Sequence, residues 1–172
     1  MSAAPARDVA LRVELADWRA LPPAERQAVA QLEISAEQIE YAGTIARSVA
    51  ACEAGDPAEV AGLAIRADGA IVGWLLVKRR ASAPDWVGDD AVVLSGLRID
   101  QRLQGRGIGA LALVELAGWV GRHWPEAARL MLRVDEGNLA GVRAYEKAGW
   151  REAGERRVGR VGLERTMVMA LR

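Results

Sequence analysis

The sequence predicts one α/β domain of the mixed α+β kind. We expect a central, twisted, mostly antiparallel sheet of about six or seven strands, flanked by about four helices. Three observations lead to this prediction. Apolar runs of strand length recur along the chain, separated by helical patterns. An Asp-Gly dipeptide between two such runs is typical of an antiparallel hairpin. A strand, helix and strand unit over residues 91–134 predicts one parallel pair.

The composition is that of a folded protein without a global charge. The chain has 172 residues, 51% of them hydrophobic, with 23 basic and 23 acidic residues. This suits one domain over residues 1–172, with residues 1–8 as a flexible tail. Balanced charge disfavours nucleic acid as a partner. The single cysteine, Cys52, and single histidine, His123, cannot form a metal cluster. Without a signal peptide or a membrane-length apolar run, we expect no membrane association and a cytoplasmic protein.

The first third of the chain predicts one strand and two helices. Alternating apolar and polar residues over 9–15 indicate a half-buried strand. A helix is expected from Pro23, since proline is tolerated in a first turn. Ser35 and Gln38 have the spacing of a capping box, so a second helix begins there. We expect it to run without a break over residues 36–54 and to end at the glycine that follows.

The middle of the chain predicts a hairpin and a surface loop. Apolar runs at 60–66 and 71–79 flank the Asp-Gly dipeptide at 68–69. Residues 81–90 contain a proline, a glycine and three aspartates, which is typical of a surface loop. Trp86 in this loop either caps the edge of the core or forms a wall of a substrate pocket.

A glycine-rich stretch joins a buried strand over residues 91–99 to a buried helix over 108–120. No Ser, Thr, Asp or Asn lies between Asp100 and Ile108, so the first N–H groups of the helix lack a side-chain cap. The glycines allow a tight turn and the close approach of a ligand. The stretch is either a simple turn or, with the nearby Arg106, a site for a phosphate group.

The last third predicts a strand, a helix and two more strands. Residues 130–134 are a strand parallel to 91–99. Asn138 has the position of an N-cap, and Gly149 the position after the end of that helix. Two final strands are expected over 150–157 and 163–171. Their edges would allow two copies of the chain to pair as a homodimer.

Two motifs together resemble the Gcn5-related N-acetyltransferase (GNAT) superfamily. They are Gln104-x-x-Gly107-x-Gly109 and the segment 138–150, each preceded by a strand. The resemblance extends over residues 60–171. It implies acetyl-CoA as the acyl donor, a small-molecule amine as the acceptor and no metal. Residues 97–109 and Gln38-x-x-Tyr41 are also similar to the bacterial spermine/spermidine acetyltransferase subgroup.

The resemblance implies a role for each matched residue. Backbone N–H groups of the glycine loop would hold the pyrophosphate, and the backbone of the preceding strand would pair with the pantetheine arm. The strands ending at Ile99 and Val134 should therefore splay. Asn138 would reach the coenzyme arm or serve only as a cap. Tyr145 would protonate the thiolate or serve only in packing. The residues expected to bind the coenzyme are Leu97, Ile99, Gln104, Gly105, Arg106, Gly107, Ile108, Gly109, Asn138 and Tyr145.

The general base and the acceptor stay open. Ser95 stands where some family members have a carboxylate. Candidate bases acting through water are Glu33, Glu40, Asp89 and Asp90. A polyamine acceptor would need an acidic pocket, for which the sequence offers Asp85, Asp89, Asp90 and Glu40. Other small amines, amino acids, aminoglycosides or a protein N-terminus are alternatives.

Two other functions fit parts of the sequence. Gly105-x-Gly107-x-x-Ala110 imitates a dinucleotide-binding fingerprint, with Asp135 as the ribose ligand of an oxidoreductase. Against this, four residues separate Asp100 from Gly105, whereas that fingerprint follows its strand directly. The second alternative is a non-catalytic domain of the same fold that binds or senses CoA.

Overall fold

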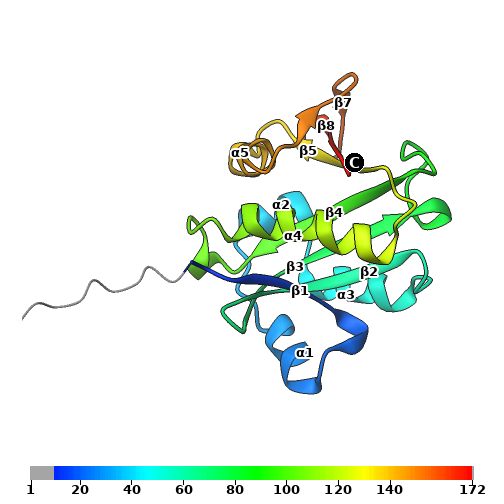
Figure 1. Ribbon diagram of the computed structural model, residues 1–172. Coiled ribbons are helices and arrows are strands. Elements are labelled where there is room, and N and C mark those ends of the chain that lie inside the picture. The colour runs from blue at the N-terminus through cyan, green and yellow to red at the C-terminus, as the bar shows by residue number, and fades with distance from the viewer. Residues whose placement is uncertain (1–9, 172) are drawn as a thin grey trace, which may run out of the picture.

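The computed structural model describes residues 10–171, which form one open, eight-stranded sheet with helices on both faces (Figure 1). The strand order is β1-β2-β3-β4-β5-β8-β6, and β7 pairs with β8. Among the described strands, β4 and β5 alone are parallel, as predicted. The strands are β1 (Val13–Asp17), β2 (Val60–Ala67), β3 (Ala70–Arg79), β4 (Ala91–Ile99), β5 (Arg129–Asp135), β6 (Arg151–Glu152), β7 (Arg157–Val158) and β8 (Leu163–Ala170).

Two hydrophobic cores lie on the two faces of the sheet. On one face, Leu113 and other residues of α4 pack on Val92 and Leu94 of β4. On the other face, the buried Cys52 packs with Trp74 of β3. Consecutive strand residues point to opposite faces, so one strand serves both cores. The α-helices of the described chain are α1 (Pro23–Ala30), α2 (Ala36–Ala42), α3 (Ile45–Ala54), α4 (Ile108–His123) and α5 (Leu139–Lys147).

The predicted continuous helix over 36–54 is wrong, because the chain breaks between α2 and α3. The capping box at Ser35 is present, but Gly43 has a φ of +75° and ends α2. Thr44 then caps α3 by accepting a hydrogen bond from the Arg47 N–H. The buried guanidinium of Arg98 donates to the Gly43 carbonyl at 2.9 Å. Glycine followed by a capping threonine is a local signal for this break, and the distant Arg98 supports it.

The hairpin of β2 and β3 and the loop after it match the prediction. Asp68 and Gly69 have φ angles of +48° and +84°, which suit a tight two-residue turn. In the surface loop, Trp86 packs beside Val87, and the Arg133 guanidinium lies 4.1 Å from the Trp86 ring centroid. Trp86 therefore caps an edge of the core, and it lines neither of the two cavities described below.

A bulge in β4 directs the strand away from β5. Trp74 pairs with Arg98 and Leu76 with Ser95, so two residues of β4 oppose one residue of β3. Gly96, with a φ of +60°, lies in this bulge, where a positive φ favours glycine. Pairing between β4 and β5 covers only Ala91–Val93 and Arg129–Met131. The expected splay of these two strands is confirmed.

The ends of the chain differ in detail from the prediction. The first strand begins at Val13, and Val9 lies outside the described residues. The expected strand over 150–157 is instead two short pieces, β6 and β7, which both pair with β8. A glycine of positive φ, Gly154, lies between them and interrupts the strand. Within residues 10–171, no helix combines the length and the apolar character needed to cross a bilayer.

Candidate active site

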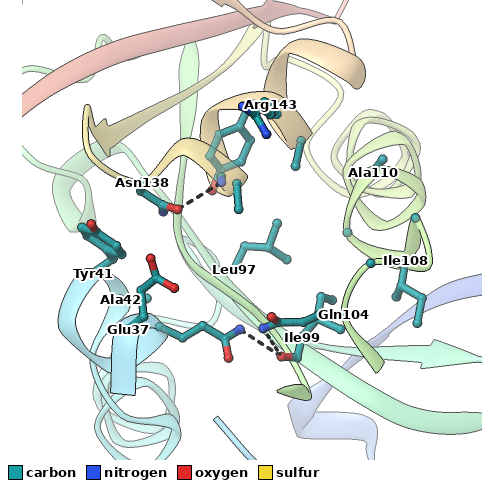
Figure 2. Close-up of a pocket in the computed structure, with 18 of the residues that line it drawn as sticks. Glu37, Tyr41, Ala42, Leu97, Ile99, Gln104, Ile108, Ala110, Asn138 and Arg143 are labelled. Carbon is teal, nitrogen blue, oxygen red and sulfur yellow. Dashed lines mark hydrogen bonds between the residues drawn. The ribbon is translucent and has the colours of Figure 1, made fainter. Parts of the chain in front are cut away.

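A cavity of about 410 Å³ opens where β4 and β5 separate, and α2, α4 and α5 contribute to its walls (Figure 2). Nine of the ten residues expected to bind the coenzyme line it, although they come from three separate segments. Arg106 is exposed beside the cavity and does not line it. The nine are Leu97, Ile99, Gln104, Gly105, Gly107, Ile108, Gly109, Asn138 and Tyr145.

The glycine loop presents the uncapped N-terminus of α4 to this cavity. Gly107 is the N-cap residue, with a φ of +79°, and no side chain caps the helix. A Cβ added at Gly105 or Gly107 would meet no atom within 4 Å, so the space beside the loop is open. The unpaired N–H groups and the positive end of the helix dipole together favour an anion. This geometry fits a diphosphate.

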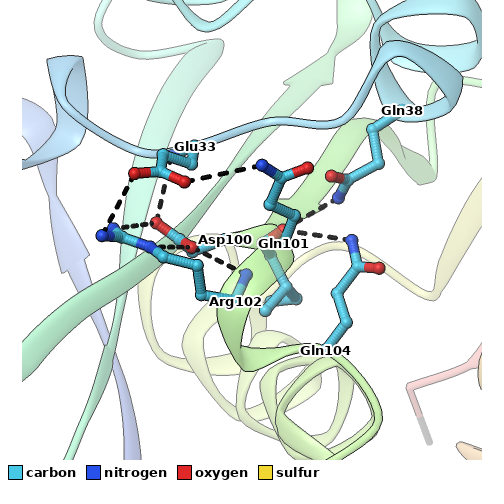
Figure 3. Close-up of polar contacts among 7 residues, drawn as sticks. Glu33, Gln38, Asp100, Gln101, Arg102 and Gln104 are labelled. Carbon is cyan, nitrogen blue, oxygen red and sulfur yellow. Dashed lines mark hydrogen bonds and ion pairs between the residues drawn. The ribbon is translucent and has the colours of Figure 1, made fainter.

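Asp100 fixes the start of the loop (Figure 3). Its carboxylate is buried and accepts hydrogen bonds from the Arg102 Nε at 2.9 Å and the Glu33 N–H at 3.0 Å. The hydrogen bonds from Arg102 hold the pKa of Asp100 well below its usual range. Arg102 also pairs with the Glu33 carboxylate at 3.2 Å. The segment before α2 is thereby tied to the loop before α4.

The peptide groups of Ile99 face the open side of β4. The Asp100 N–H donates to the Val72 carbonyl at 2.8 Å, which places Ile99 and Gly73 in a non-hydrogen-bonded pair. The Ile99 carbonyl already accepts from the side-chain amides of Gln38 at 2.9 Å and Gln104 at 3.4 Å. The Ile99 N–H is therefore the group of this residue that a ligand can use.

Asn138 and Tyr145 reach the cavity from α5. The Asn138 side-chain oxygen accepts from the Gly141 N–H at 3.0 Å, which confirms its N-cap role and leaves its amide NH₂ as a donor. The Tyr145 ring centroid lies 5.8 Å from that of Trp150. Burial raises the pKa of Tyr145 to about 12. Its hydroxyl makes no hydrogen bond to any residue of the described chain, so this donor is available in the cavity.

Glu37 is the one carboxylate among the residues of the described chain that line the cavity. Figure 2 shows its carboxylate pointing inward between Tyr41 and Leu97. The carboxylates expected from the sequence do not line the cavity. Glu33 is paired with Arg102, Glu40 lies outside the wall, and the acidic loop at residues 85–90 precedes β4 at the opposite end of that strand. The predicted acidic pocket for a polyamine is therefore wrong at these residues.

Three residues that shape the site were not predicted from the sequence. Gly96 forms the bulge, and a glycine inside an apolar strand is a recognised signal for one. Arg98 is a charged residue inside the same apolar run, which indicates a buried, satisfied guanidinium. Glu37 precedes Tyr41 by one helical turn, but the direction of that face depends on the break after Ala42.

Residues 15–150 match the model of the acetyltransferase (GNAT) family. The chain belongs to the GNAT family. This membership makes the protein an N-acetyltransferase with acetyl-CoA as its acyl donor, and it removes the dinucleotide-dependent oxidoreductase from consideration. No cluster of three or more metal-ligating side chains occurs in the described part of the chain.

Solved structures with the same fold include several acetyltransferases. Aminoglycoside acetyltransferase AAC(6')-Ib in complex with coenzyme A has a TM-score of 0.74 and 17% identity, covering 92% of this chain and 95% of that one. The GNAT domain of S. lividans PAT has a TM-score of 0.68 and 20% identity, covering 93% and 90%. Spermidine N-acetyltransferase from Vibrio cholerae in complex with CoA and spermine has a TM-score of 0.68 and 14% identity, covering 92% and 95%. The TM-scores show a shared fold, and at these identities they show the fold alone. No curated protein matches the sequence.

Proposed function

We propose that the protein transfers an acetyl group from acetyl-CoA directly to a primary amine of a small molecule. One observation carries the proposal. The uncapped N-terminus of α4 opens on a cavity that also contains a phenol and a carboxylate, at the point where β4 and β5 separate. A thioester is already activated, so the protein mainly has to position it beside an amine.

The phosphates would be held at the start of α4. The N–H groups of residues 105–109 provide hydrogen-bond donors, and Arg143 and Lys147 add positive charge from the α5 wall of the cavity. Arg106 is exposed, and within the described chain it makes no ion pair, so its side chain is available to the phosphates.

The pantetheine arm would follow the open edge of β4. The backbone of Leu97 and the N–H of Ile99 lie along this edge, beyond the last pair of the β4–β5 ladder. The amide NH₂ of Asn138 faces the arm from α5. Because the strands splay, these groups are not consumed by a neighbouring strand.

Tyr145 would donate its proton to the departing sulfur. Its pKa of about 12 keeps the phenol protonated at all physiological pH values. The desolvation that raises the pKa of the phenol also raises the pKa of a thiol in the same cavity, so the departing thiolate is a stronger base toward this proton than it would be in water. The proton thus comes from the wall of the cavity, where solvent access is limited.

Glu37 would remove the proton from the acceptor amine, directly or through one water molecule. An ammonium group cannot attack a carbonyl, so a proton acceptor is needed near the amine. Ser95 cannot serve as that acceptor, because its hydroxyl is a poor base and it does not line the cavity. Glu37 has the required chemistry and points inward from α2.

Acetyl-CoA consumption across a panel of amines tests the proposal. The panel contains amino acids, amino acid amides, polyamines, aminoglycosides and an N-terminal peptide, and calorimetry with CoA and NAD runs beside it. We expect binding of CoA but not NAD, and turnover with a subset of the small amines. Binding of CoA without any turnover would identify a sensing domain, and the absence of CoA binding would overturn the site itself.

A further inference from the structure

A second cavity, of about 150 Å³, adjoins the first on the other side of β4. Ala42 lines both cavities. In the bulge of β4, Gly96 lines the second cavity whereas Leu97 lines the first. The remaining walls come from α3, β3 and β4, so this space lies on the face opposite α4. The wall residues are Ala42, Thr44, Arg47, Ser48, Ala51, Leu76, Ser95, Gly96 and Arg98.

The charged residues of this wall are Arg47 and Arg98, and no carboxylate of the described chain lines it. Ser95 of β4 also lines this space, and its side chain is neutral. The cavity therefore has two positive charges and hydroxyl groups but no acid. Such a surface favours a small anion, because uncompensated guanidinium groups attract negative charge most strongly where solvent is partly excluded.

Arg98 supplies a fixed positive charge. It is 2% exposed, and its guanidinium donates to the backbone carbonyls of Gly43 at 2.9 Å and Gly96 at 2.6 Å. Carbonyls satisfy its N–H groups without neutralising its charge. Burial lowers the pKa of Arg98 to about 10, so it remains charged at neutral pH.

Arg47 supplies a mobile charge at the rim. It is exposed on the first turn of α3, and within the described chain it forms no ion pair. Its long side chain can turn toward a ligand without losing an existing partner. A fork of two N–H donors suits a carboxylate in particular.

We propose that the second cavity binds the carboxylate of the acceptor, so that the natural acceptors are small zwitterions of the amino acid type. This inference rests on the proposed function. The amine of such an acceptor would face Glu37 in the first cavity, while its carboxylate would face Arg47 and Arg98 in the second. Ala42 lines both cavities, and on this proposal the amine and the carboxylate of one small molecule would lie on either side of it. A polyamine would instead bring positive charge against two arginines.

The test compares each amino acid with its own amide, which keeps the amine and removes the negative charge. Binding is measured by calorimetry with the protein saturated with CoA, so that no turnover is needed, and kcat/KM is measured with acetyl-CoA. For the amino acids that bind best, we expect the acid to bind about tenfold more tightly than its amide. An amino acid and its amide differ in the pKa of the amine as well as in charge. Because this difference is the same for every variant, it cancels when the acid-to-amide binding ratio is compared between variants.

Arg47→Gln is the diagnostic variant, and Arg122→Gln is its matched control. Arg122 is an exposed arginine near the end of α4 that lines neither cavity. We expect Arg47→Gln to lower the acid-to-amide ratio about tenfold, toward one, while binding of the amides and of CoA stays unchanged. Arg122→Gln should keep the wild-type ratio.

The inference is overturned if amides or polyamines bind wild-type protein as well as the acids do, if no acid in the panel binds, or if Arg47→Gln keeps the wild-type ratio. Failure of the proposed function has a different signature. In that case CoA does not bind, or no amine of any class is acetylated. Turnover of amines with an acid-to-amide ratio near one would leave the proposed function standing and remove only this inference.

Discussion

The two ends of the active-site cavity are built in different ways. At the end beside α4, which we call the donor end, the groups offered to a ligand are backbone N–H groups of a glycine loop. At the end beside α2 and α3, which we call the acceptor end, the groups offered to a ligand are side chains. Glu37 lines the first cavity and Arg98 lines the second. Backbone groups present the same donors whatever the neighbouring side chains are, whereas a single substitution changes the charge of the other end. A fold built in this way can keep the same acyl donor while its acyl acceptor changes.

Two residues of opposite charge at the end of β4 anchor both ends, Arg98 within the strand and Asp100 directly after it. Arg98 donates to carbonyls at the end of α2, and Asp100 accepts from the N–H groups of Glu33 and Arg102. The buried guanidinium therefore satisfies backbone carbonyls, and the buried carboxylate satisfies backbone N–H groups. The segment before α2 and the break after it are both fixed by β4, so the acceptor end is positioned by the strand that carries the donor loop.

Substitution of Tyr145 should have the largest effect, because the proposed function makes this residue the proton donor of the reaction itself. Tyr145→Phe should lower kcat about 10³-fold through loss of the proton donor, with the Kd for CoA within about twofold of wild type. Because the pKa of Tyr145 is about 12, wild-type kcat should not fall on the alkaline side below about pH 10. Steady-state kinetics and calorimetry measure both. A matching loss of CoA affinity would assign Tyr145 to binding.

Substitution of Glu37 should affect the reaction of the acceptor without affecting the binding of CoA. Glu37→Gln should lower kcat/KM for the acceptor about 10²-fold by removing the proton acceptor, and leave CoA binding unchanged. Glu40→Gln is the control, since Glu40 is an exposed residue of the same helix that does not line the cavity. Equal losses in the two variants would show a general electrostatic effect of α2 instead of a catalytic base.

Substitution of Gly107 should affect the donor end alone. Gly107→Ala should raise the Kd for CoA about tenfold, because the Cβ at a φ of +79° intrudes on the phosphate space and strains the loop by about 1–2 kcal/mol. Gly154→Ala is a close control, with a φ of +75° and equally open surroundings outside the cavity. Denaturation and calorimetry should show similar stability losses but a CoA effect only at Gly107.

Substitution of Asp100 should have the smallest direct effect on catalysis and a clear effect on stability. Asp100→Asn should lower the free energy of unfolding at neutral pH by about 2 kcal/mol, through loss of charge-assisted hydrogen bonds. Because folding lowers the pKa of Asp100, its contribution is complete above the unfolded pKa of about 3.9 and is lost as the pH falls toward the folded-state pKa.

The stability difference between wild type and Asp100→Asn should therefore shrink as the pH falls below about 4. Chemical denaturation over a pH series measures it. Asp85→Asn, at an exposed loop position, should match wild type throughout. A constant gap across the series would mean that the ionised carboxylate is not the stabilising species.

Local patterns in the sequence located most elements and the donor loop. The missing cap before Ile108, the capping box at Ser35, the Asp-Gly turn and the N-cap at Asn138 all occur as predicted, since each depends on groups only a few residues apart. The break at Gly43 and the division of the strand after Trp150 were missed. At Gly43 the apolar periodicity continues across a local signal, a C-cap glycine before an N-cap threonine, and the supporting contact from Arg98 is distant in the sequence.

The sequence by itself determined the donor end of this protein, because a glycine loop before an uncapped helix produces the same backbone donors in whatever fold contains it. The tertiary structure alone decided the acceptor end. There, Glu37, Arg47 and Arg98 belong to three different elements, and whether they line a cavity depends on how those elements pack. Convergence of side chains through space leaves no periodic or local mark in a chain, so the charge of the acceptor pocket was readable only from the folded molecule.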